Sequence, residues 1–321
     1  MNIYAINYGV GQYAITENQI RDSLGDLNER AHISVSAFDQ LNHEALGAAE
    51  FLVAPRFDTE VIRKHAPNLR LAHCINAGVE RFMPLDWLPR GAIFSNSSGI
   101  HAVKAREYAL MSILMLNSRM PQFAYDQSQR RWQPIFTSPV ADKKLLVVGT
   151  GGIGTAVALA GGTLGLSVTG VSRSGRPAEG FNRVVPQDAL DDVLPDADFV
   201  VLACPLTPET QNLISARRIS SLKPGAGIVN MARGAVVDYN AITDALNRNA
   251  LAGCVADVFE VEPLASESTL WDVPRFVVTP HISCDAPTGY VEAGLRLFAK
   301  NVRALTLGEP VANVVNPELG Y

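Results

Sequence analysis

The sequence has no surplus of basic residues and no long hydrophobic run. Its 321 residues include 27 Lys and Arg against 32 Asp and Glu, which gives a formal net charge of -5 at pH 7. This balance argues against general nucleic-acid binding, which needs a positive surface. No apolar run reaches the length of a membrane span, and no Lys or Arg precedes Arg21, so neither a membrane helix nor a secretory signal is predicted. We expect a cytoplasmic protein without membrane contacts.

Cysteine is scarce and unpatterned. Cys74, Cys204, Cys254 and Cys284 lie far apart and match neither a CxxC pair nor the spacing of zinc ligands. Three of them lie in or beside strand-like apolar runs. We therefore predict reduced, mostly buried thiols and no metal site.

The hydrophobic content, 47%, is arranged in short runs. A chain of this length predicts two domains, each with its own core. Apolar runs alternate with polar or amphipathic stretches, which is typical of βα units and parallel sheets. The runs after Lys144 are almost continuously apolar, as in sheets that helices cover on both faces. In order, the runs are NIYAIN, HISVSAF, FLVAP, LRLAHCIN and AIFSN, then KLLVVG, LSVTGVS, DFVVLAC, GIVNMA, GCVADVF and RFVVTP.

Three helices can be placed. Thr16 and Gln19 have the spacing of a capping box, which marks the start of a helix. A long apolar-rich segment from His101 predicts a helix that continues to Pro121, with an apolar face wide enough for burial or for a subunit interface. The stretch 290–307 predicts a helix near the end of the chain.

A glycine-rich turn follows the run KLLVV. Gly149, Gly151 and Gly154 satisfy the pattern G-x-G-x-x-G between a predicted strand and a predicted helix. The first glycine permits a tight turn, the second allows a pyrophosphate to approach the backbone, and the third lets helix pack on strand. The pattern predicts a dinucleotide site at the helix N-terminus. Gly161 and Gly162 are unfavourable inside a helix, so we expect this helix to be short or frayed there.

The second strand of this unit is predicted to end near Ser172. An NAD-binding chain tends to have an acidic residue here for the ribose 2'-hydroxyl, but this chain has Ser172, Arg173 and Ser174, with Arg176 close by. A guanidinium pairs with a 2'-phosphate, which a carboxylate would repel. We predict a preference for NADP(H), with NAD(H) as a second cofactor and Arg173 as the main contact. The alternative is a solvated turn that merely lacks the acid.

Three further motifs carry a family resemblance. They are NMARGAVVD (230–238), ADVFEVEPL (256–264) and TPHIS (279–283), and they place Arg233 29 residues before Glu262 and Glu262 19 residues before His281. With PLTPETQNLI (205–214) and LKPGA (222–226), the chain resembles the D-isomer-specific 2-hydroxyacid dehydrogenase family over most of residues 75–317.

The resemblance implies catalytic roles for Arg233, Glu262 and His281. Hydride transfer to a 2-keto acid leaves charge on the keto oxygen, so a histidine that donates a proton suits the reaction. A carboxylate beside the imidazole stabilises its protonated form, and a guanidinium can bind the substrate carboxylate while it polarises the carbonyl. Taken singly, Arg233 and Glu262 would be surface charges and His281 a structural histidine.

The resemblance also implies contacts with the cofactor and the substrate. Asp257 resembles the residue that hydrogen-bonds the nicotinamide carboxamide; its alternative is a turn-capping Asp. In NAGVERF, the backbone amides of Gly78 and Val79 are expected to receive the substrate carboxylate, with Glu80 where the family has Asp. The other implied cofactor contacts are Gly152, Ile153, Pro205, Thr210 and Ala232.

The fold implied by the resemblance has two Rossmann-like, doubly wound parallel-sheet domains with a cleft between them. A flavodoxin-like substrate domain is expected over 1–99 and 288–321, and a dinucleotide-binding domain over 100–287. His101 lies in the first crossing, as a hinge or interface residue or near the substrate, and Trp132 lies where relatives have an arm that reaches the partner subunit. A homodimer through the cofactor domain is expected.

The function predicted is NAD(P)H-dependent reduction of a small 2-keto acid, of the glyoxylate or hydroxypyruvate type, to the D-2-hydroxy acid. SSGIHA, QRRW and NVVNPELGY favour the glyoxylate/hydroxypyruvate reductase-like members. One alternative is a dinucleotide-sensing, corepressor-like binding protein on the same fold. Another is a dehydrogenase of a larger or phosphorylated D-2-hydroxy acid.

Overall fold

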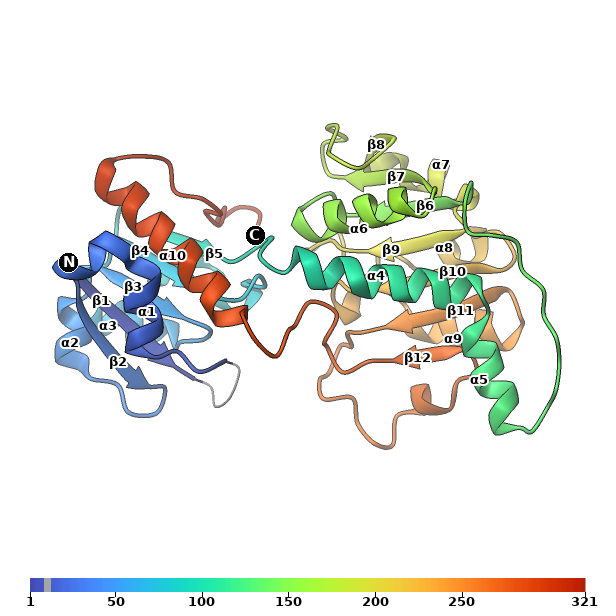
Figure 1. The fold of residues 1–321 in the computed structure, drawn as a ribbon, viewed down its shortest axis with the longest axis horizontal. Coiled ribbons are helices and arrows are strands. Elements are labelled where there is room, and N and C mark those ends of the chain that lie inside the picture. Colours follow the sequence, from blue (N-terminus) through green and yellow to red (C-terminus); the bar gives the residue numbers. More distant parts are fainter. Residues whose placement is uncertain (9–12, 321) are drawn as a thin grey trace. The chain divides into compact units, whose positions relative to one another are not determined.

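A computed structural model describes residues 1–8 and 13–320. The chain divides into two compact units (Figure 1). Unit 1 comprises Met1–Ile100 and Ala286–Tyr321, and unit 2 comprises His101–Asp285. Each unit has a fully parallel sheet covered by helices, so the predicted α/β fold class is confirmed.

Unit 1 is built on a five-stranded sheet of order β2-β1-β3-β4-β5. Helices α1 and α10 supply Ile20, Leu295 and Phe298 to one face, whereas α2 and α3 supply Leu46 and Ile62 to the other. Successive side chains of a strand point to opposite faces, so Ile3 and Tyr4 enter different cores. The strands are β1 Asn2–Asn7, β2 His32–Ala37, β3 Phe51–Ala54, β4 Leu71–Cys74 and β5 Ile93–Asn96; the helices are α1 Glu17–Leu24, α2 His43–Ala48, α3 Thr59–His65 and α10 Tyr290–Leu307.

Two local predictions for unit 1 are confirmed. Thr16 caps α1 and forms the complete capping box with Gln19. Helix α10 spans the predicted residues, and it returns to unit 1 from the far end of the chain (Figure 1).

Unit 2 is built on a seven-stranded sheet of order β12-β11-β10-β9-β6-β7-β8. Helices α4 and α6 pack on one face, and α7, α8 and α9 pack on the other. The chain reverses direction across the sheet between β6 and β9, where ligands of such sheets bind. The strands are β6 Lys144–Val148, β7 Ser167–Ser172, β8 Arg183–Pro186, β9 Phe199–Leu202, β10 Ala226–Asn230, β11 Leu251–Ala256 and β12 Phe276–Val278.

The helices of unit 2 are α4 Ala102–Asn117, α5 Met120–Ser128, α6 Gly152–Thr163, α7 Leu190–Val193, α8 Ala216–Ser221 and α9 Tyr239–Asn247. Short 3-10 helices are η2 Gly25–Arg30, η3 Glu80–Phe82, η4 Leu85–Trp87, η5 Gln187–Ala189, η6 Leu194–Asp196, η7 Gly234–Val236 and η8 Thr269–Asp272. No helix in the described part of the chain is long and apolar enough to span a membrane.

The predicted helix from His101 to Pro121 is wrong at its end. Helix α4 stops at Asn117, Arg119 adopts a left-handed conformation with φ 57°, and a second helix, α5, starts at Met120. Pro121 therefore lies in the first turn of α5, where its missing N–H costs no helical hydrogen bond. Proline marks a helix start here, not a helix end.

Two further details differ from the prediction. Strand β8 was not predicted, because its sequence RVVP has only two apolar residues and it pairs only with β7 at the sheet edge. The expected fraying of α6 is not found, since the helix continues through Gly161 and Gly162 to Thr163. A Cβ on Gly161 would lie 2.6 Å from Leu145 Cδ2, so this glycine permits close packing of α6 on the sheet.

The four cysteines are free thiols, as predicted. Cys74, Cys204 and Cys254 are buried and Cys284 is half-buried. Burial raises the pKa of the Cys284 thiol to about 11, so this thiol is protonated at neutral pH.

Candidate functional site

The glycine turn closes between β6 and α6 without room for side chains. Gly149 has φ 101°, and its N–H donates to Val171 O at 2.8 Å. A Cβ on Gly154 would lie 1.8 Å from the carbonyl oxygen of Gly149, so the third glycine is required by the turn itself. Gly151 caps α6, and Gly152 and Ile153 begin it, so the unpaired N–H groups of the first turn can bind an anion.

The predicted 2'-phosphate loop begins where β7 ends, at Ser172. The Ser172 hydroxyl accepts a hydrogen bond from the Gly175 N–H at 3.1 Å, so this side chain shapes the turn. Arg173 and Ser174 are exposed. A hydrogen bond with Thr207, and to a lesser degree the charge of Arg173, lower the pKa of Glu209. Arg173 therefore lies close enough to Glu209 for an electrostatic interaction between the two side chains.

The loop after β9 carries Pro205 and Thr210, two predicted cofactor contacts. The buried Thr210 hydroxyl accepts from the Thr207 N–H at 2.7 Å and donates to Pro205 O at 2.7 Å. The Thr210 hydroxyl thus acts as both donor and acceptor inside the loop, and these two bonds fix the loop that carries Pro205.

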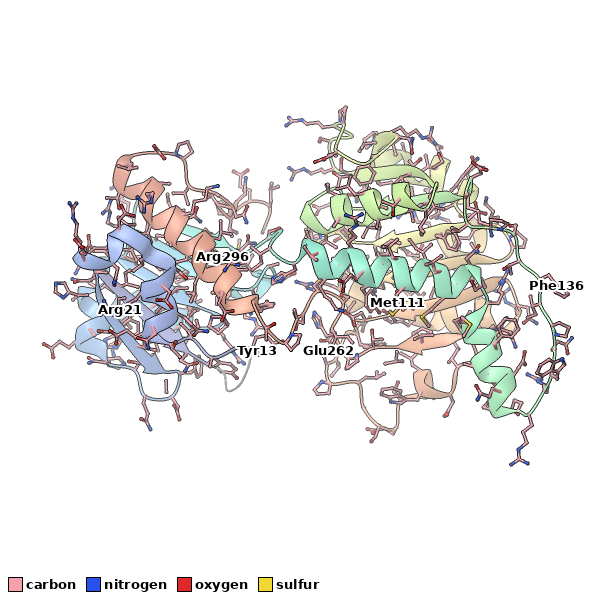
Figure 2. All side chains as sticks on the ribbon, in the orientation of Figure 1. Tyr13, Arg21, Met111, Phe136, Glu262 and Arg296 are labelled. Atoms are coloured by element: carbon pink, nitrogen blue, oxygen red, sulfur yellow. The ribbon has the colours of Figure 1, made fainter. Side chains whose placement is uncertain are left out.

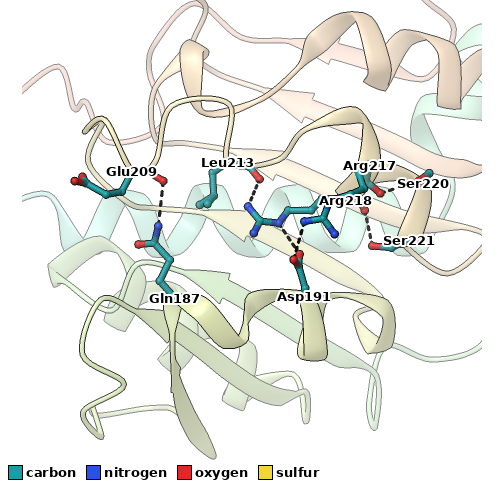
Figure 3. Close-up of polar contacts among 8 residues, drawn as sticks. All are labelled: Gln187, Asp191, Glu209, Leu213, Arg217, Arg218, Ser220 and Ser221. Carbon is teal, nitrogen blue, oxygen red and sulfur yellow. Dashed lines mark hydrogen bonds and ion pairs between the residues drawn. The ribbon is translucent and has the colours of Figure 1, made fainter.

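Neighbouring segments brace the same loop (Figure 3). Gln187 donates to Glu209 O at 3.0 Å, and Arg218 donates to Leu213 O at 2.8 Å. Hydrogen bonds from Arg218 and Arg217 lower the pKa of Asp191 to about 2, which keeps this carboxylate ionised as a bridge between α7 and α8.

A buried asparagine that the sequence reasoning missed organises the end of β10. Asn230 Oδ1 accepts from the Ala232 N–H at 3.0 Å, and Nδ2 donates to Arg233 O and Tyr239 Oη at 3.0 and 2.9 Å. Arg233 Nη1 also donates to Ala232 O at 2.7 Å. The sequence contained a signal for this role, because a buried polar residue at the end of an apolar strand requires hydrogen-bond partners.

The loops after β10 and β11 are in direct contact. A Cβ on Gly234 would lie 2.0 Å from the carbonyl carbon of Phe259, so only glycine fits beside Arg233. The Phe259 N–H donates to Glu262 Oε1 at 2.8 Å, which orients the predicted carboxylate.

His281 and Glu262 form a hydrogen-bonded pair. His281 Nδ1 lies 2.7 Å from Glu262 Oε2, and the imidazole side chain is 52% exposed. Because a carboxylate oxygen can only accept, Nδ1 carries the hydrogen and Nε2 is available for proton exchange with a ligand. The exposed position of Glu262 on unit 2 is labelled in Figure 2.

Asp257 is entirely buried beneath the turn that carries His281. Its carboxylate accepts hydrogen bonds from the Thr279 hydroxyl at 2.5 Å and from the N–H groups of Ile282 and Ser283 at 2.9 and 2.8 Å. These hydrogen bonds give Asp257 a structural role in the turn, and its contact with the carboxamide stays a prediction.

The predicted carboxylate-binding loop lies in unit 1, after β4. Asn76 Nδ2 donates to Pro55 O at 3.0 Å, and Asn96 Nδ2 donates to Ala77 O at 2.8 Å, so the first two residues of NAG are fixed. No hydrogen bond among the described residues uses the N–H groups of Gly78 and Val79. These two N–H groups therefore remain able to donate to a ligand, and their contact with a substrate carboxylate stays a prediction.

Comparison with known proteins places the chain in a family. Residues 110–283 match the model of the D-isomer specific 2-hydroxyacid dehydrogenase, NAD binding domain. The chain belongs to the D-isomer specific 2-hydroxyacid dehydrogenase family. Like other members, it is an NAD(P)-dependent enzyme of this class.

Named relatives and solved structures extend over nearly the whole chain. One relative is glyoxylate/hydroxypyruvate reductase B of Pectobacterium carotovorum subsp. carotovorum (strain PC1), to which this chain is 32% identical over 295 residues. The alignment covers 89% of this chain and 91% of the relative. Among solved structures, a D-isomer specific 2-hydroxyacid dehydrogenase from Xanthobacter autotrophicus Py2, in complex with NADPH and MES, matches with a TM-score of 0.86 at 28% sequence identity. This match covers 100% of this chain and 99% of that chain. At 23% identity, an NADPH-dependent glyoxylate/hydroxypyruvate reductase from Sinorhizobium meliloti, solved with NADP and sulfate, shares the fold with TM-score 0.83 and covers 100% of each chain.

Proposed function

We propose that the protein reduces a small 2-keto acid, of the glyoxylate or hydroxypyruvate type, to the D-2-hydroxy acid, with NADPH as the preferred cofactor. The observation that carries this proposal is the 2.7 Å hydrogen bond between His281 Nδ1 and Glu262 Oε2. An imidazole held by a carboxylate on one nitrogen is suited to proton transfer at the other.

Each catalytic role follows from the chemistry of the keto group. When bound, the nicotinamide dinucleotide supplies the hydride for the keto carbon. His281 donates a proton from Nε2 to the keto oxygen, and Glu262 stabilises the protonated imidazole. Arg233 binds the substrate carboxylate and polarises the carbonyl. In unit 1, the N–H groups of Gly78 and Val79 are the proposed donors to a carboxylate.

The residues present fit a dinucleotide with a 2'-phosphate. Gly149 and Gly154 form a turn that a Cβ would fill, and the first turn of α6 supplies N–H groups for the pyrophosphate. The absence of a carboxylate at Ser172 and the exposed Arg173 favour the 2'-phosphate. The Xanthobacter relative was solved with NADPH, which supports the same preference.

We also propose a homodimer formed through unit 2. Apolar side chains are exposed on α4, on α5 and on the extended segment after them, where Trp132 and Phe136 are 98% and 94% exposed. Figure 2 labels Met111 on α4 and Phe136 on that segment. Large exposed apolar groups in a folded protein mark interaction surfaces.

The test is NADPH oxidation at 340 nm with a panel of 2-keto acids that includes glyoxylate, hydroxypyruvate and a phosphorylated keto acid. We expect turnover with the small acids. His281→Asn should lower kcat/KM by about 10²–10⁴-fold, because it removes the general acid, and should leave NADPH binding intact. His32→Asn, at the exposed first residue of β2, is the matched control. Full activity of His281→Asn, or no turnover of any keto acid, would contradict the proposal.

A further inference from the structure

The turn that carries His281 is held in an unfavourable conformation. His281 has φ 54°, and its N–H donates to Asp257 O and Thr279 O at 2.9 and 3.1 Å. A left-handed conformation is unfavourable for a residue other than glycine. Such a residue persists only where its surroundings fix it, so the contacts around this turn decide where the imidazole lies.

The Asp257 carboxylate makes most of those contacts. All three of its hydrogen bonds come from the turn, from Thr279 before His281 and from Ile282 and Ser283 after it. The carboxylate is entirely buried, so water does not compete for these bonds.

A tyrosine from α4 extends this network. Tyr108 Oη lies 2.7 Å from Thr279 Oγ1 and is buried. The single hydrogen of the Thr279 hydroxyl is donated to Asp257, so Tyr108 must be the donor toward Thr279. Burial raises the pKa of Tyr108, so the phenol keeps the hydrogen that it donates. The result is a directed chain from Tyr108 through Thr279 to Asp257.

The same series of hydrogen bonds connects residues near both ends of unit 2. Tyr108 belongs to α4, which begins at Ala102, directly after the first crossing between the units. Ser283, which donates to Asp257, lies two residues before unit 2 ends at Asp285. The segments that lead into and out of this unit are therefore fixed to one carboxylate.

We propose that Tyr108 and Thr279 are positioning residues for the reduction. Through Asp257 they hold the His281 turn in the conformation that keeps the imidazole against Glu262. This inference rests on the proposed function, because it assigns His281 the role of proton donor. Neither residue needs to touch the substrate.

The kinetic test compares variants that remove or keep one hydroxyl. Tyr108→Phe should lower kcat by about 10-fold and Thr279→Val by about 10–100-fold, because small misplacements of a catalytic group are costly. KM for the keto acid and for NADPH should stay within about 2-fold. Thr279→Ser keeps the hydroxyl and should retain kcat within about 3-fold.

Tyr4→Phe is the matched control. Tyr4 is also fully buried, and its hydroxyl accepts one hydrogen bond, from the Asn42 N–H at 2.9 Å, but it belongs to unit 1. Its kcat should equal that of the wild type. Equal kcat for Tyr108→Phe, Tyr4→Phe and the wild type, or a failure of Thr279→Ser to restore what Thr279→Val loses, would overturn the inference.

A second measurement needs no substrate. The imidazole Cε1–Hε1 resonance of His281, assigned by its loss in His281→Asn, should move in Tyr108→Phe and stay in place in Tyr4→Phe. If the wild type turns over no keto acid but this resonance moves, the proposed function fails and the positioning network stands. If the wild type is active and the resonance does not move, the positioning network fails alone.

Discussion

Arg173 lies on an exposed turn and interacts electrostatically with the carboxylate of Glu209. A bound 2'-phosphate would give this guanidinium a stronger, charge-assisted partner. The proposed discrimination between NADPH and NADH therefore rests on one side chain of a surface loop, and it can be tested without disturbing the core.

Arg173→Asp should raise the Kd of NADPH by about 10–100-fold, because a hydrogen bond to a charged group contributes about 1.5–3 kcal/mol. The Kd of NADH should change by no more than about 3-fold. Fluorescence titration with both cofactors measures the difference. Arg183→Asp, the same change at the start of β8, is the control. Equal losses for the two cofactors would refute the assignment.

His73 makes the stability of the protein depend on pH. It is fully buried on β4, and its two ring nitrogens lie 2.8 and 3.0 Å from the hydroxyl oxygens of Ser95 and Ser97. Burial lowers the pKa of His73 from 6.5 to about 3. Below pH 6.5 the unfolded chain therefore binds a proton that the folded chain does not, and folding stability falls as pH falls.

The expected loss is about 1.4 kcal/mol for each pH unit between 6.5 and about 3. Between pH 7 and pH 5 the wild type should lose about 2 kcal/mol more unfolding free energy than His73→Asn. Urea unfolding at the two pH values checks this, with His32→Asn as the control at an exposed site. A variant with the same pH dependence as the wild type would contradict the assignment to His73.

At the scale of elements, α6 shows that adjacent glycines can have opposite functions. A Cβ on Gly161 would meet Leu145 Cδ2 at 2.6 Å and Val168 Cγ2 at 3.2 Å, whereas Gly162 is exposed with nothing within 4 Å. The first glycine sets the distance between the helix and the sheet, and the second only weakens the helix.

Gly162→Ala should therefore raise the free energy of unfolding by about 0.5–1 kcal/mol. Gly161→Ala should lower it by about 1–3 kcal/mol, because the added methyl group overpacks the core. Thermal unfolding of both variants measures the two effects, and each variant serves as the control for the other. An increase in stability for both variants would show that the packing at Gly161 is not limiting.

At the scale of the whole molecule, the exposed apolar side chains of unit 2 predict self-association. Met111→Asp combined with Phe136→Asp should convert a dimer to a monomer, because charged groups in an apolar interface lose their hydration. Light scattering after size exclusion gives the mass. Leu307→Asp, at the exposed end of α10, is the control and should leave the dimer intact. A wild type that is monomeric at tens of micromolar would contradict the proposal.

Local signals in the sequence were sufficient for much of the fold. The capping box at Thr16, the apolar runs of eleven strands and the glycine turn each depend on a few neighbouring residues, and each is present in the structure. The strand RVVP was not predicted and Pro121 was misjudged, because an edge pairing and a change of helix direction are set by contacts distant in sequence.

The order of residues along the chain was enough to predict which glycines form the turn, and which arginine, carboxylate and histidine follow which strand. This was possible because these residues follow the carboxyl ends of parallel strands, where side chains meet at one edge of the sheet. The hydrogen-bond partners of each group are known only from the folded structure. Asn230 orders Arg233, Thr210 closes its own loop, and Tyr108 reaches Thr279 across 171 positions. Such bonds depend on distances in the folded unit, which no local pattern encodes.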